Sequence, residues 1–132
     1  MSDMPSALLV RLKADGGVAA LTTRHHWRIV PQNATLPYSR LIRAGGRREQ
    51  HLKSYQATRR ERVQVDAMAA SYAEAAALAE AIVLAVAMPA EVDGVRFGRT
   101  AAGEPRDDGE DVPGKGYVYR TSVDLLFEYA LI

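Results

Sequence analysis

The chain has 132 residues, of which 48% are hydrophobic and 25% are charged, and its formal net charge is +1. This length predicts a single domain, 1–132, and the composition is that of an ordinary globular protein. The absence of cysteine excludes disulfide bonds, a thiolate nucleophile and a cysteine-bound metal, and it favours a reducing compartment. No apolar run approaches the roughly 20 residues that span a membrane. The first ten residues lack the basic segment of a signal peptide. Neither a membrane partner nor a leader is therefore expected.

The first half of the sequence predicts one helix and two strands. Residues 4–14 carry leucines at helical spacing, with Ser6 as a candidate N-cap. Segment 25–30 is aromatic and β-branched, which predicts a short strand, and segment 37–44 alternates in the way of a second strand. The basic segment 45–58 has no clear period, and a loop of this length is seldom without a role. We interpret it as either a projecting hairpin arm or an interaction loop that orders on assembly.

The centre of the chain passes from a strand directly into a helix. Odd-numbered residues of 61–69 are apolar from Val63 on, and the even-numbered ones are polar until Met68, so one face of this strand is predicted to be buried. Ser71 and Glu74 have the S-x-x-E spacing of a capping box. An apolar stripe at helical spacing follows, and a proline ends it; the stripe consists of Ala75, Leu78, Ala79, Ile82, Val83 and Val86.

The last third of the sequence predicts two strands separated by a polar loop. A turn and a strand occupy 91–97, the acidic segment 102–116 is interpreted as a loop, and 117–129 alternates as one long strand. Together the elements predict an α+β, two-layer domain. Its antiparallel sheet has about four strands, two helices cover one face, and a long extended loop or hairpin arm projects from it.

No segment predicts a catalytic site. Residues 109–115 fit G-x-x-x-x-G-K, but Gly116 stands where a P-loop has serine or threonine, and a strand follows instead of a helix. The acids of this segment lack EF-hand spacing, so we interpret them as a solvated hairpin tip. His25 and His26 are neighbours that point to opposite faces of a strand, which disfavours a shared metal ion. We therefore expect no enzyme, no cofactor and no metal site.

Charge is divided between the two halves of the chain. Residues 1–66 hold 12 Lys/Arg and 5 Asp/Glu, a net charge of +7, whereas residues 67–132 hold 5 and 11, a net charge of −6. Such asymmetry indicates an electrostatic partner, either a polyanion or another copy of the chain; the alternative is that both charge groups are solvated loops. The basic cluster between Arg40 and Arg62 suits phosphate contacts, but no helix-turn-helix, zinc-finger or RNP-like motif accompanies it. Pairing of these arginines with acids of a neighbouring subunit is the alternative.

Several segments spread over most of the chain resemble one protein family. The most specific stretch is V-Q-V-D at 63–66, followed by S-Y-A-E-A at 71–75 and the Ala/Leu-rich helix. The other matching segments are 19–21, 28–31, 36–38 and 119–125. The pattern resembles the bacteriophage tail-completion proteins, also called tail-terminator or head–tail joining proteins.

The resemblance implies a structural virion protein, assembled in the host cytoplasm, that forms a hexameric ring at the head-proximal end of the tail. The implied partners are further copies of the chain, the tail tube protein and the head–tail connector or stopper protein. Genomic DNA is implied to pass through the lumen without sequence-specific binding. The alternative function is a small nucleic-acid-binding module with a basic loop.

A ring joins two different patches of the same chain, which suits a basic half and an acidic half. We therefore expect charged residues of segments 45–60 and 104–112 to form the subunit interface or the channel. These candidates are Arg47, Arg48, Lys53, Arg59, Arg60, Asp107, Asp108, Glu110 and Asp111.

Overall fold

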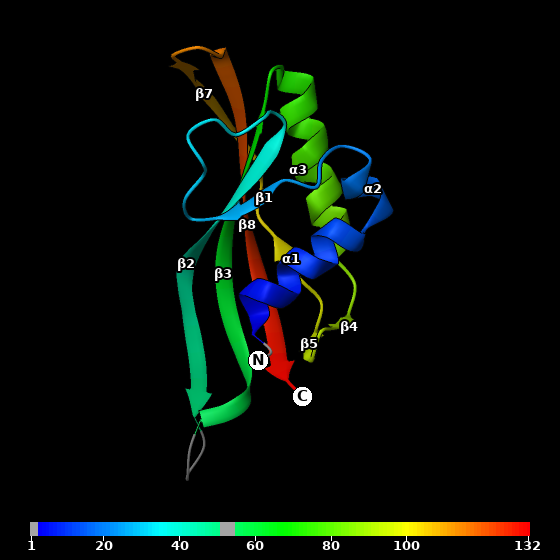
Figure 1. Ribbon diagram of the computed structural model, residues 1–132. Helices are drawn as coiled ribbons and strands as arrows, with labels where there is room; N and C mark the ends of the chain where they lie inside the picture. The colour runs from blue at the N-terminus through cyan, green and yellow to red at the C-terminus, as the bar shows by residue number, and fades with distance from the viewer. Residues whose placement is uncertain (1–2, 51–54) are drawn as a thin grey trace.

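The computed structural model describes residues 3–50 and 55–132, with the side chains of 3–46 and 58–132. In these ranges three helices pack against one mixed sheet of eight strands (Figure 1). The helices are α1 (Met4–Ala14), α2 (Gly16–Ala19) and α3 (Tyr72–Val86). The strands are β1 (His25–Trp27), β2 (Tyr38–Gln50), β3 (Tyr55–Ala69), β4 (Ala90–Val92), β5 (Val95–Phe97), β6 (Ala101–Ala102), β7 (Arg106–Val112) and β8 (Gly116–Leu131).

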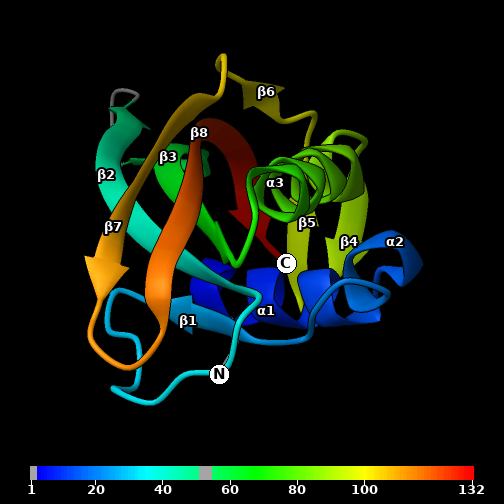
Figure 2. The ribbon, with the colours of Figure 1, turned by 90° about the horizontal axis from the view of Figure 1, so that it is seen from above.

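The sheet follows the order β1-β2-β3-β8-β5-β4, and β6 and β7 also pair with β8. Strand β1 runs parallel to β2, and the other pairs are antiparallel. The sheet curls into a half-barrel, and α1 and α3 lie against its hollow side (Figure 2). The three long strands β2, β3 and β8 therefore form the frame on which the rest of the chain is placed.

The predicted fold class is wrong. The sequence predicts an antiparallel sheet of about four strands with two helices, whereas the described residues form a mixed sheet of eight strands with three helices. Segment 102–116 contains the additional strand β7, and the described parts of segment 45–58 lengthen β2 and β3. Both segments are polar on both faces and lack the apolar alternation that marks a half-buried strand. Backbone hydrogen bonding to a neighbouring strand nonetheless holds the parts of these segments that lie in β2, β3, β7 and β8, because a ladder does not require apolar side chains.

The core fills the space between the helices and the hollow side of the sheet. The predicted alternation in the central strand ends at Val65, because Asp66 and Met68 are buried as well, but the predicted burial of its odd-numbered residues is confirmed, since Val63, Val65 and Ala67 of β3 are fully buried. They meet the apolar faces of α1 and α3 and the inward residues of β5 and β8, including Phe97 and Phe127 in edge-to-face contact. The largest fully buried side chains are Phe97, Phe127, Met4, Leu8, Leu12, Leu41, Leu78, Ile82 and Leu125.

Side-chain oxygens cap both long helices. Ser71 Oγ accepts a hydrogen bond from Glu74 N at 3.2 Å, which confirms Ser71 as the N-cap of α3. At α1 the predicted cap is wrong by three residues, because Asp3 accepts from Ser6 N at 2.7 Å.

The described part of the chain contains no helix that is long and apolar enough to cross a membrane.

Two hairpins replace the two predicted loops. Strands β2 and β3 pair from Tyr38↔Met68 to Gln50↔Tyr55. The paired part of segment 45–58 is therefore a hairpin arm and not a loop that orders only on assembly. A bulge interrupts this hairpin at Gly45, whose φ of 98° falls in the region that favours glycine. The second hairpin pairs β7 with β8, and its turn is closed by Lys115 N donating to Val112 O at 2.9 Å.

Candidate functional site

The predicted acidic residues share one strand. Asp107, Asp108, Glu110 and Asp111 all lie on β7, so the interpretation of this segment as a hairpin tip is wrong. The tip is formed instead by the turn that follows Val112. All four side chains lie at the surface, as those of a strand at the margin of the sheet do.

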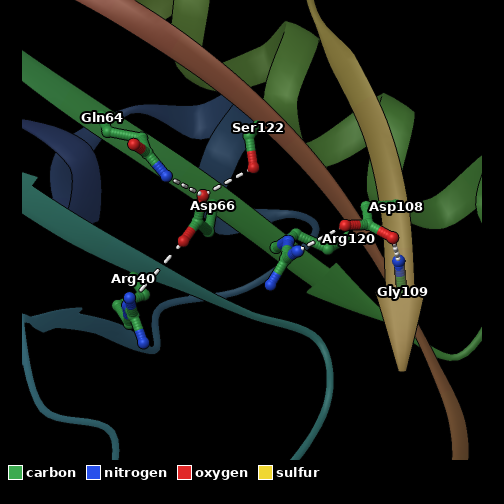
Figure 3. Close-up of polar contacts among 7 residues, drawn as sticks. All are labelled: Arg40, Gln64, Asp66, Asp108, Gly109, Arg120 and Ser122. Atoms are coloured by element: carbon green, nitrogen blue, oxygen red, sulfur yellow. Dashed lines mark hydrogen bonds and ion pairs between the residues drawn. The ribbon is translucent and has the colours of Figure 1, made fainter. Parts of the chain in front are cut away.

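Two of these acids are held by the neighbouring strand β8. Asp108 Oδ2 pairs with Arg120 Nη2 at 2.8 Å, and its Oδ1 accepts from Gly109 N at 2.8 Å (Figure 3). The bond from the Gly109 N–H, and then the one from Arg120, lower the pKa of the Asp108 carboxyl. Thr121 Oγ1 donates to Asp107 Oδ1 at 3.0 Å. Asp107 and Asp108 are therefore fixed in position by contacts within the chain.

The predicted basic residues lie on the β2–β3 hairpin. Arg59 and Arg60 belong to β3, the backbones of Arg47 and Arg48 belong to β2, and Lys53 lies outside the described residues. Strand pairing places Arg47 opposite Arg60 and Arg48 opposite Arg59. The hairpin thus places the backbones of two arginine pairs, 11 to 13 residues apart in the sequence, opposite one another.

Glu61 balances part of this positive charge. It forms an ion pair with Arg43 on β2 and accepts a hydrogen bond from Tyr129 Oη on β8 at 2.9 Å. Burial, and secondarily the bond to Glu61, raises the pKa of Tyr129. Arg60 Nε lies 3.8 Å from Glu128 Oε2, a pair in which both side chains are at least half exposed. The basic hairpin is thereby tied to β8 through two carboxylates.

The acids and the arginines lie at opposite ends of β8. Asp107 is opposite Thr121, whereas Arg59 is opposite Tyr129. At about 3.4 Å per residue, these two ends are about 27 Å apart along the strand. The described arginines on β3 and the acids of β7 therefore cannot pair with one another inside one chain.

A polar centre that the sequence does not predict joins the three long strands. Asp66 of β3 is 2% exposed, although it stands among the even-numbered residues assigned to the solvent face. It accepts hydrogen bonds from Ser122 Oγ of β8 at 2.6 Å and from Gln64 Nε2 at 2.9 Å (Figure 3). Arg40 Nε of β2 lies 3.7 Å from Asp66 Oδ2. The V-Q-V-D motif was the only sequence signal for this centre, and it did not indicate burial.

The two adjacent histidines occupy different environments. His25 is buried and its Nδ1 lies 2.6 Å from Ser39 Oγ, whereas the His26 ring packs edge-on against Tyr38. Burial, with smaller effects of Lys13 and His26, lowers the pKa of His25 to about 4. Within the ranges that the structure describes, no three His, Asp or Glu side chains are placed to hold a metal ion.

A pocket lies between α3 and the strands β6 and β7. Its volume is about 420 Å³, and it is bordered by Glu80, Glu104 and Asp107 over a floor that includes Ala79 and Val123. The border is acidic and the floor is apolar, so the pocket suits a cationic or amphipathic side chain better than an anionic ligand.

Comparison with solved structures identifies a similar fold. A chain in the structure titled "Virion of native gene transfer agent (GTA) particle" superposes with a TM-score of 0.60 and 17% sequence identity, covering 97% of this chain and 93% of that chain. At this level of identity the likeness establishes the fold. A comparison with curated proteins gives no match.

The family described as tail completion protein gp17 matches residues 6–125, from α1 into β8. This match covers most of the chain and confirms the resemblance inferred from the sequence. The chain therefore belongs to the tail completion protein gp17 family, and it is a structural protein of the virion tail that associates with other tail and head proteins.

Proposed function

We propose that six copies of the chain form a ring at the head-proximal end of the tail. The ring ends the tail tube and joins it to the head connector, and genomic DNA passes through its channel without sequence-specific binding. Membership of the tail completion family supports a place at this junction. The chain acts by contact with its neighbours and carries no catalytic step.

The separation of charge along β8 is the observation that carries this proposal. Arginines at one end of the strand and acids at the other are too far apart to pair inside one chain, as the register shows. A ring uses a head-to-tail interface, in which one patch meets a different patch of the next copy. Such an interface brings the acids of β7 to the arginines of the β2–β3 hairpin and adds to the partial neutralisation by ion pairs within each chain.

A nucleic-acid-binding module is the competing function, and the contacts of the hairpin favour the ring over it. Glu61 pairs with Arg43, and Glu128 pairs with Arg60, so carboxylates stand among the arginines. A surface that binds phosphates is weakened by such acids, because each one repels the backbone it would have to approach. The same mixture of charges suits a protein surface that is itself mixed, such as β7 with its four acids and Arg106.

Electron microscopy of the purified protein mixed with tail tubes tests the proposal. We expect rings, alone or seated at one end of each tube, and a hexameric mass for the particles. Tube ends that stay bare at saturating protein would overturn the proposal. A protein that instead shifts duplex DNA in a gel, with binding lost as salt rises, would establish the nucleic-acid-binding module.

Charge reversal tests the electrostatic part of the interface. Arg59→Glu combined with Arg60→Glu should weaken ring assembly, and so should salt well above physiological concentration, since exposed charges are screened. Arg99→Glu is the matched control, because Arg99 is an exposed arginine outside the hairpin. Equal assembly of the double variant, the control and the unchanged protein at low and high salt would show that these charges do not hold the ring.

A further inference from the structure

Besides the three-residue terminal strands β1 and β4, the described sheet has two longer open backbone edges. On one side β7 pairs with β8, and no described strand lies beyond it. On the other side β1 covers β2 only at Ser39, Arg40 and Leu41, so β2 has no described neighbour on that side from Ile42 to Gln50. An uncovered edge presents unpaired N–H and C=O groups, which makes it a template for another strand.

The ladder determines the direction of the backbone groups on β7. Asp124 O and Glu128 O accept from Gly103 N and Gly98 N, so even-numbered residues of β8 face away from β3, and the register places even-numbered residues of β7 against them. The Gly109 N–H therefore points away from β8, and it donates to the Asp108 carboxylate at 2.8 Å (Figure 3). Residues of an antiparallel strand alternate between facing their partner strand and facing away. The N–H groups of Asp107 and Asp111 therefore point outward too, and they are available to a strand on the open side.

The same alternation applies to β2. Ser39 N donates to Arg24 O at 3.0 Å, and Leu41 O accepts from Arg28 N at 2.8 Å, so odd-numbered residues at this end of β2 face β1. The next such residue is Arg43, which lies beyond the last residue of β1. The backbone N–H and C=O of Arg43 are therefore the first outward groups of the open edge. The bulge at Gly45 separates the part of the edge before it from the part after it.

The two edges carry opposite charge. Strand β7 has four acids and one arginine, whereas the sequence of 42–50 has three arginines and one acid. Like charges directly across a strand pair are destabilising and opposite charges are stabilising. Two β7 edges therefore repel each other, as do two β2 edges, and only the pairing of β7 with β2 is attractive. A contact between two different edges is head-to-tail, which is the contact that generates rings.

We infer that β7 of one copy adds to the Ile42–Gln50 edge of the next copy, as an antiparallel strand that continues the sheet from subunit to subunit. This inference rests on the proposed ring and specifies how its subunits join. Strands β2 and β8 are both antiparallel to β3, and β7 is antiparallel to β8, so β7 and β2 run in opposite directions. Copies related by a rotation keep that relation when the strands are tilted from the ring axis, as they are in a closed sheet.

The position of the edges also fixes an offset between copies. Strand β7 pairs with the first half of β8. Residues 42–50 pair with the part of β3 that lies beside the second half of β8. Neighbouring copies are therefore staggered along the strand direction when the edges pair. A stagger of this kind accompanies strand tilt in any sheet that closes on itself.

Removal of one outward N–H tests the pairing. Asp111→Pro deletes the outward donor and the charge, while Asp111→Asn deletes the charge and keeps the donor. Proline is tolerated on an edge strand when the lost N–H faces away from the sheet, so the monomer should fold, as circular dichroism can verify.

We expect ring formation on tail tubes to fall about tenfold more for Asp111→Pro than for Asp111→Asn. Rings that form equally well with both variants would overturn the pairing and leave the ring in place, whereas unchanged protein that forms no ring at tube ends would overturn the proposed function.

Cross-linking gives a second test that holds even if Asp111→Pro fails to fold. The chain has no cysteine, so every disulfide reports an introduced pair. Asp111→Cys is mixed with single-cysteine variants at Ile42, Arg43, Ala44, Arg47 and Arg48 in turn. Under mild oxidation, we expect one or two adjacent positions to give a covalent dimer with Asp111→Cys. Failure at all five positions in assembled rings, or preferential linking of Asp111→Cys to itself, would overturn the inference.

Discussion

Ser122 Oγ donates a 2.6 Å hydrogen bond to Asp66, a carboxylate that is 2% exposed in the middle of the sheet. The bond links β8 to β3, and the nearby guanidinium of Arg40 adds β2. A buried carboxylate is tolerated only when it is hydrogen-bonded and paired, and Asp66 has both kinds of partner. The frame that carries the two charged edges is thus joined at its centre by one polar group.

Asp66→Ala should destabilise the protein strongly. The change leaves the Ser122 hydroxyl and the Gln64 amide without their acceptor, and we expect the free energy of unfolding to fall by roughly 2–4 kcal/mol. Asp124→Ala is the matched control on β8, because Asp124 pairs with Arg106 at the surface and its loss should cost less than about 1 kcal/mol. Urea denaturation of the two variants measures the difference. Equal midpoints would mean that the buried centre contributes no more than a surface ion pair.

His25 makes stability depend on pH. Its pKa is about 4 in the folded protein, lowered chiefly by burial from the ordinary histidine value of 6.5. Between pH 4 and pH 6.5 the unfolded chain binds more protons than the folded one. The contribution of His25 to the free energy of unfolding therefore has its full value above pH 6.5 and is lost as the pH falls toward 4. The expected loss from this group is on the order of 3 kcal/mol.

Comparison with His25→Gln isolates this contribution, because glutamine does not titrate and the carboxylates common to both proteins cancel. Thermal unfolding at intervals from pH 7.5 to pH 4 should show the unchanged protein losing stability faster than the variant. Parallel curves over this range would show that His25 keeps an ordinary pKa.

Ser71→Ala should shorten or loosen the start of α3. Ser71 Oγ accepts from Glu74 N, and the loss of an N-cap costs about 1 kcal/mol. Ser71→Asp is the control, since aspartate is an equally good N-cap and should retain the wild-type stability. A loss of stability that is the same for alanine and aspartate would point to packing of Ser71 and not to capping. Guanidinium denaturation resolves a difference of this size.

The elements that bury an apolar face could be predicted from the sequence. The central strand and α3 lie where the change of period from two to 3.6 places them, and the N-cap is correct because its chemistry is local. Strand β7 could not be found in this way, because its residues are polar on both faces and only the ladder to β8 reveals it. The burial of Asp66 depends on the side chains that β2 and β8 place around it. The alternation within residues 61–69 carries no information about those neighbouring strands.

For the candidate site, the sequence indicates which residues carry the charge but not where they meet. The acidic and basic groups were identified as clusters, and their separation along β8 follows from strand register, which the charge pattern does not determine. The roles of Arg47, Arg48, Lys53, Arg59, Arg60 and the four acids stay predictions. The assembly experiments with charge reversal and with cross-linking address them directly.

Gly46→Ala should open the β2–β3 hairpin. A Cβ at Gly46 would come within 2.2 Å of the Arg60 carbonyl oxygen and 2.7 Å of Glu61 Cα, which are backbone atoms that cannot turn aside. The hairpin must shift or separate at this point, and we expect a loss of roughly 1–3 kcal/mol in the free energy of unfolding, the usual range for overpacking.

Gly16→Ala is the matched control, because nothing lies within 4 Å of the added Cβ in α2 and alanine favours a helix. Hydrogen exchange of the amides along 58–62 should accelerate in Gly46→Ala and stay unchanged in Gly16→Ala. If the pairing inferred for the open edge is correct, Gly46→Ala should weaken ring assembly as well, because it distorts the strand on which β7 of the next copy would pair.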